Sequence, residues 1–232
     1  MLITTWTPPD ADSRTGEEQL VGFDQGRPSR ILVLPAWFDE ANKLRRFTIE
    51  VMRKLDEIGI DSALPDLPGC NESRADLRSQ TIAGWREAAK AAAQHFRANY
   101  VLSIRAAALI TPEGLPGWRY AEHTGPKLLN GMLRARVISA REQGLQEDRD
   151  SLLTAGKSEG LTLAGWSLGA EMIRELETAV PPASGIQYAI TQTQLGGAGL
   201  WLRAEPDDDA EQSTALAALI AEDLATPETP AP

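Results

Sequence analysis

The feature that most constrains the fold is a run of alternating strands and helices between residues 30 and 104. "RILVLPAW" at 30–37 is an apolar, β-branched run typical of a buried strand. From about Asn42 apolar residues recur every three or four positions, as in an amphipathic helix that Gly59 would end. "IDSALP" then predicts a second strand, residues 82–96 a second helix, and "NYVLSI" a third strand. This order predicts an α/β fold with a doubly wound, mostly parallel sheet flanked by helices.

The second half of the chain is less regular, so we expect the fold to be reduced there. Apolar spacing predicts helices at 128–142 and 172–180, and "GLWLRAEP" at 199–206 is typical of a further strand. The length fits a single α/β domain over residues 1–224. Residues 225–232 are proline-rich and are predicted to be a disordered tail.

Charge and composition exclude several classes of function. The formal net charge is -10 and the basic residues are scattered, which argues against nucleic-acid binding. The two histidines, His95 and His123, lie in unrelated segments, so we expect neither a metal site nor a cofactor. Cys70 lies in a Pro/Gly turn and is expected to be a small filler. The sequence has no membrane-spanning run and no signal peptide, so we expect a cytoplasmic protein.

One stretch, "LTLAGWSLGAEM" at 161–172, has the pattern of a serine nucleophile. Gly165-Trp166-Ser167-Leu168-Gly169 matches the G-x-S-x-G turn, in which glycines allow a sharp bend that exposes a serine hydroxyl above a sheet. The same serine, placed before an amphipathic helix, is also a favoured N-cap residue. The pattern therefore predicts either a nucleophile or a helix cap.

Four segments in chain order resemble a known family. They are "LPAWFDEANKLRRF", "LPDLPGCNES", "GPKLLNGMLRARV" and "LAGWSLGAEMIREL". Together they are similar to the second type of exosortase A system-associated hydrolases, over about Gln19 to Pro181. The resemblance implies an α/β-hydrolase fold and a bacterial locus for exopolysaccharide synthesis or protein sorting.

The same resemblance places the nucleophile elbow after "NYVLSI", at residues 103–107, with Arg105 at the nucleophile position. It also implies that arginine at this elbow is a feature of the family. Arginine stays protonated and cannot act as a nucleophile. The neighbours Ser103, Ala106 and Ala107 replace the usual glycines, which argues against a strained turn. The helix after the elbow is expected to be cut to residues 106–110.

A Ser167 nucleophile would also lack a base. The chain order in this fold is serine, then acid, then histidine, and no histidine follows Ser167. We therefore expect Ser167 to begin a helix and the protein to be catalytically degenerate, a pseudoenzyme that binds a ligand or partner. The alternative is an active serine ester or thioester hydrolase that uses Ser167 with His123 as an out-of-order base.

The loop after the first strand, "PAWFDEANK", lacks the glycines of an oxyanion loop, and Pro35 has no N–H to donate. We expect Trp37, Glu40, Asn42 and Lys43 to form a ligand site with Arg105. An anion would suit Arg105 at a helix N-terminus, and we expect a small acyl or glycan-related ligand or a protein of the same pathway. The alternative for the charged loop residues is a solvated helix N-terminus with Asp39 and Glu40 favoured by the helix dipole.

A third class of function, a purely structural interaction module, makes a separate prediction. It requires Trp37 and Trp118 to lie on an exposed apolar patch rather than in the core.

Overall fold

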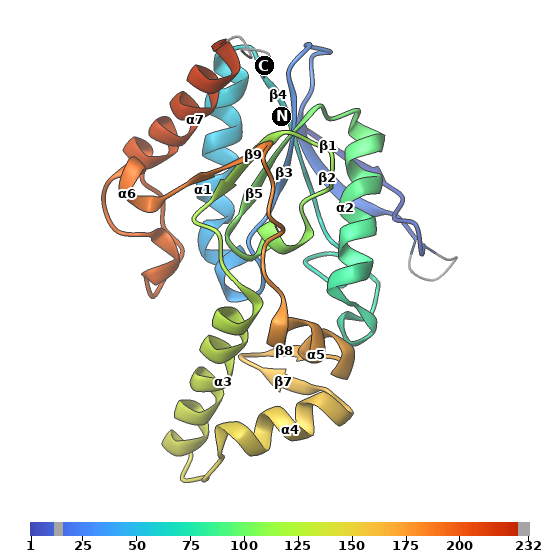
Figure 1. Ribbon diagram of the computed structural model, residues 1–232, viewed down its shortest axis with the longest axis vertical. Helices are drawn as coiled ribbons and strands as arrows, with labels where there is room; N and C mark the ends of the chain where they lie inside the picture. Colours follow the sequence, from blue (N-terminus) through green and yellow to red (C-terminus); the bar gives the residue numbers. More distant parts are fainter. Residues whose placement is uncertain (12–15, 227–232) are drawn as a thin grey trace.

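A seven-stranded sheet runs through the protein in the order β1-β2-β4-β3-β5-β6-β9 (Figure 1). The computed structural model describes residues 1–11 and 16–226. The strands of this sheet are β1 (Leu2–Trp6), β2 (Glu18–Phe23), β3 (Arg30–Leu34), β4 (Asp61–Pro65), β5 (Tyr100–Ile104), β6 (Gly117–Tyr120) and β9 (Gln187–Ile190). β1, β2 and β4 pair antiparallel, whereas β4, β3, β5, β6 and β9 pair parallel. The predicted mostly parallel sheet is confirmed.

Helices cover both faces of the sheet. Successive residues of β3 point to opposite faces, so the strand has apolar side chains that need cover on each face. Leu32 and Leu34 share a buried cluster with α2 (Ile82–Phe96), while Ile31 and Val33 share another with α1 (Asp39–Glu57). α7 (Ala210–Ala225) packs beside α1 on the second face (Figure 1). Short helical turns connect these elements: η1 (Leu77–Ser79), η2 (Arg105–Ile110), α6 (Gln192–Leu195) and η3 (Leu200–Leu202).

A cap lies beyond the carboxyl ends of the parallel strands, inserted between β6 and β9 (Figure 1). It consists of α3 (Gly125–Glu142), α4 (Arg149–Glu159), β7 (Leu161–Leu163), β8 (Trp166–Leu168) and α5 (Ala170–Thr178). Thr124 and Asp148 cap α3 and α4 by accepting backbone N–H groups with their side chains. Because ligands of open α/β sheets bind outside the carboxyl ends of the strands, the cap covers the edge where a site is expected.

The predicted strand at 199–206 is wrong. Leu200–Leu202 form the 3₁₀ turn η3, in which Leu200 is buried with the α1 cluster while Leu202 is exposed. Within the described residues the sheet ends at β9, and this segment does not pair with the free edge of that strand. α7 extends to Ala225, and residues 227–232 of the predicted tail lie outside the described residues.

Two further observations bear on the sequence expectations. Trp37 and Trp118 are 2% and 3% exposed, so both belong to the core and form no exposed apolar patch. None of the helices in residues 1–11 and 16–226 is long and apolar enough to cross a membrane.

Candidate functional site

Arg105 begins the turn at the carboxyl end of β5 with a backbone φ of 59°, in the left-handed region. The expectation that the missing glycines would relax this turn is wrong. Ser103, Ala106 and Ala107 are all fully buried, so packing around the turn holds Arg105 in a conformation that costs a non-glycine residue free energy. The turn that follows is cut to η2, as predicted.

The guanidinium of Arg105 is held by groups of the protein itself. Its Nε and Nη2 donate to the two carboxylate oxygens of Glu40 at 3.0 and 2.8 Å. Its Nη1 donates to the carbonyl oxygen of Ala121 at 2.8 Å, and the guanidinium carbon lies 4.0 Å from the centre of the Trp201 ring. A bidentate pair of this kind uses the charge and the geometry that an anion would need. Arg105 is therefore not free for the anionic ligand that the sequence led us to expect, because the carboxylate of Glu40 already occupies that position.

His123 completes this group from the residues after β6. Its Nδ1 lies 3.2 Å from Arg105 Nη2 and 3.9 Å from a Glu40 carboxylate oxygen. Burial lowers the pKa of His123 below its usual 6.5; the charges of Arg105 and Lys127 lower it further, while that of Glu40 raises it. His123 is therefore neutral near pH 7.

We expect the stability to depend on pH through His123. Its pKa is 6.5 when unfolded and lower when folded, so below pH 6.5 the unfolded chain binds more protons. The free energy of unfolding should fall as the pH drops through 6.5 and level off below the folded pKa. Urea denaturation between pH 5 and 8 would measure this slope, and His123→Gln should reduce it. If the free energy of unfolding of the variant depended on pH just as steeply, a group other than His123 would be the cause.

Four strands of the sheet are each followed by a non-glycine residue in the left-handed region. These residues are Phe38 after β3, Asn71 after β4, Arg105 after β5 and Ala121 after β6, with φ between 47° and 59°. Such conformations persist where the surroundings fix them, and they cluster at functional sites. Four of the six non-glycine residues with positive φ among the described residues therefore lie at the carboxyl edge of the sheet.

Ser167 lies away from this edge, in strand β8 of the cap. β7 and β8 form an antiparallel hairpin in which Ser167 pairs with Thr162, and the two hydroxyl oxygens are 3.0 Å apart. The prediction that Ser167 begins a helix is wrong, because α5 starts one turn later with Gly169 as its N-cap. Ala164 and Gly165, with φ of 49° and 87°, form the hairpin turn instead of a nucleophile elbow.

Two cavities flank an aromatic contact between the cap and the core. Phe38 and Trp166 lie 5.6 Å apart between ring centres, and both line a cavity of about 290 Å³ and another of about 170 Å³. The larger cavity is lined by Asn42, Arg45 and Asp66, and the smaller by Glu40 and His123. Both lie where the cap meets the ends of β3 and β4, so they are the candidate ligand sites.

The structure brings only part of the predicted site together. Arg105 and Glu40 form a pair, and Trp37 lines both cavities. Asn42 lines only the larger cavity, and Lys43 is paired with Asp39 at 2.8 Å.

Sequence reasoning placed Arg105 and Glu40 in one site but missed the other members of the group. The sequence suggests a role for His123 only as a base for Ser167, whereas its polar contacts are with Arg105 and Glu40. No sequence pattern indicates that Trp166 and Lys127 line the cavity or that Trp201 stacks on Arg105. The signal that could have located His123 is the short strand "GWRY", which ends at Tyr120, three residues before His123.

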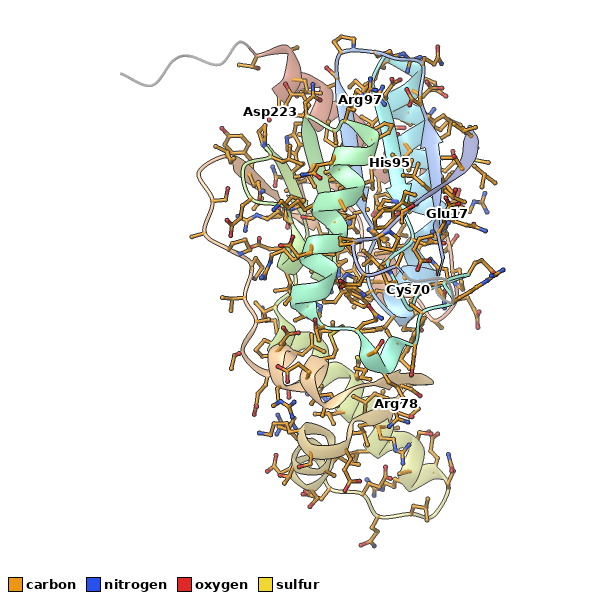
Figure 2. All side chains as sticks on the ribbon, turned by 90° about the vertical axis from the view of Figure 1, so that its right-hand side faces the viewer. Glu17, Cys70, Arg78, His95, Arg97 and Asp223 are labelled. Carbon is orange, nitrogen blue, oxygen red and sulfur yellow. The ribbon has the colours of Figure 1, made fainter. Side chains whose placement is uncertain are left out.

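Cys70 and His95 take no part in this group. Cys70 lines the larger cavity, but burial, followed by the charges of Asp66 and Glu18, raises the pKa of its thiol to about 12. It therefore stays a neutral thiol. His95 is exposed near the end of α2 farther from the cap (Figure 2).

Comparison with solved structures identifies the fold. A mouse alpha/beta hydrolase domain-containing protein 10 superimposes with a TM-score of 0.59, covering 97% of this chain and 98% of its own, at 12% sequence identity. The chain has an α/β-hydrolase fold. Est1E from Butyrivibrio proteoclasticus, solved with ferulic acid bound, covers 90% of this chain and 97% of its own at 12% identity and a TM-score of 0.47. No family model and no curated protein sequence matches the chain.

In an α/β-hydrolase the nucleophile stands on a strained strand-to-helix turn. Arg105 has that backbone conformation, directly after β5 and at the carboxyl edge of the sheet. Ser167 has neither the turn nor the place in the main sheet. The turn of this chain that has the conformation and the place of such an elbow therefore holds an arginine that is bound to a carboxylate of its own protein.

Proposed function

We propose that this chain is a non-hydrolytic α/β-hydrolase-fold protein that acts by binding a ligand or a protein partner. The observation that carries the proposal is Arg105 at the elbow, with its guanidinium paired to Glu40 and its charge already used. Arginine supplies no nucleophile, and the neighbouring His123 is hydrogen-bonded to that arginine rather than to a serine. Binding remains available because the smaller cavity is lined by Glu40 and His123, and the larger one shares Phe38 and Trp166 with it.

The resemblance of four segments to the second type of exosortase A system-associated hydrolases supports a narrower proposal. On that basis we assign the chain to a bacterial system for exopolysaccharide synthesis or protein sorting, as a ligand-binding pseudoenzyme. The α/β-hydrolase fold agrees with this assignment at the level of the superfamily.

A serine-reactive probe tests the proposal directly. We expect no labelling of the folded protein by a fluorophosphonate, because Ser167 is hydrogen-bonded to Thr162 and the base that would activate it contacts Arg105 instead. The measurement is in-gel fluorescence after incubation, with a known serine hydrolase as positive control. Labelling that disappears in Ser167→Ala would overturn the proposal and establish the active hydrolase.

A further inference from the structure

The smaller cavity, about 170 Å³, lies between helix α3 of the cap and the loop after β3. Leu128 and Met132 from α3 form one wall, and Trp166 from the hairpin forms another. Apolar walls with a few polar groups are the usual construction of a small-molecule site. The groups that can carry charge at this cavity are Asp39, Glu40, His123 and Lys127.

Both carboxylates at the cavity are already neutralised. Asp39 is paired with Lys43 at 2.8 Å, and Glu40 with Arg105 at 2.8 Å. Lys127, in contrast, forms no ion pair within the described part of the chain. The ammonium group of Lys127 is therefore the charge at this cavity that no partner in the described part of the chain compensates.

His123 adds a second donor because Arg105 fixes its tautomer. A guanidinium can only donate, so the Nδ1 atom that faces Arg105 Nη2 at 3.2 Å must be the acceptor of the neutral ring. We therefore assign the proton to Nε2. Within residues 1–11 and 16–226 this Nε2 has no hydrogen-bond partner. The cavity thus offers an N–H donor and an ammonium group beside apolar walls.

We propose that this cavity binds an apolar monocarboxylate. The carboxylate accepts hydrogen bonds from His123 Nε2 and Lys127 Nζ, and the hydrocarbon chain packs against Leu128, Met132 and Trp166. This inference rests on the proposed non-hydrolytic function and names its ligand class. A neutral amide of the same shape fills the same apolar space but gains nothing from the charge of Lys127.

Binding of sodium hexanoate and of hexanamide would test the ligand class. Calorimetric titration, together with the fluorescence change of the cavity tryptophans, should show hexanoate binding about tenfold more tightly than hexanamide. Lys127→Met should remove that preference. The matched control is Lys90→Met, which makes the same change of charge on α2, away from this cavity. Equal affinities for the two ligands, or an unchanged preference in Lys127→Met, would overturn the inference.

A second variant tests the place of binding without disturbing the core. Gly131 lines the cavity, and a Cβ atom added to it meets no atom within 4 Å. Gly131→Leu should fold normally and weaken hexanoate and hexanamide alike by filling the cavity. Undiminished hexanoate binding in this variant would place the ligand elsewhere. Fluorophosphonate labelling would overturn the proposed function, whereas absent labelling with no preference for hexanoate would overturn only the ligand class.

Discussion

Replacing Glu40 with alanine is expected to lower the free energy of unfolding by about 3 kcal/mol, because it leaves a buried guanidinium without its carboxylate. The side chains of Arg105 and Glu40 are only 10% and 16% exposed, so water replaces the lost partner poorly. Arg105 Nη1 keeps the Ala121 carbonyl, but Nε and Nη2 lose both of their acceptors. Urea denaturation monitored by circular dichroism gives the measurement.

Two comparisons isolate the pair from a general effect of the substitution. Glu50→Ala on the same helix removes the partner of Arg53 at the surface and should cost less than 1 kcal/mol. The double variant Glu40→Leu/Arg105→Met should lose less free energy of unfolding than the Glu40→Leu and Arg105→Met variants lose together, since no unpaired charge remains. A Glu40→Ala protein as stable as Glu50→Ala would mean that the pair contributes nothing to holding the elbow.

The core of the fold could be predicted from the sequence because its signals are local. The strands and helices between β3 and β5 each show apolar spacing over their own length, and the short connections determine the parallel order. The cap could be predicted only in part: apolar spacing indicates α3 and α5 but not the hairpin between them. β7 and β8 have three residues each, too few to show alternation, and their pairing depends on a hairpin turn with Ala164 at positive φ.

The candidate site was only partly predictable for a different reason. Arg105 could be placed at the elbow from chain order, because the turn follows the third predicted strand directly. Its partners come from distant segments: Glu40 is 65 residues away and His123 is 18 residues away. No local sequence pattern indicates that Glu40 pairs with Arg105. The sequence therefore predicts that both charges are available to a ligand.

The two glycines of "GWSLG" show how a sequence motif can have a structural cause without a catalytic one. Gly165 is needed for the left-handed hairpin turn, with φ of 87°. Gly169 has an ordinary φ of -73°, but a Cβ on it would lie 2.0 Å from the carbonyl oxygen of Arg78. Figure 2 shows Arg78 where the core meets the cap. The motif therefore marks a hairpin and a close docking contact.

Gly169→Ala is accordingly expected to lower the free energy of unfolding by about 3 kcal/mol or more, because the added methyl group must push the backbone of η1 away from the cap. Gly165→Ala is the matched control: nothing lies within 4 Å of its added Cβ, so only the left-handed backbone costs about 1 kcal/mol. Urea denaturation of both variants measures the difference. Since Trp166 stands three residues before Gly169 and lines the smaller cavity, Gly169→Ala should also weaken hexanoate binding. Equal stability of the two variants would show that the cap can shift without cost, and the cavity would then lack the fixed walls that a selective site requires.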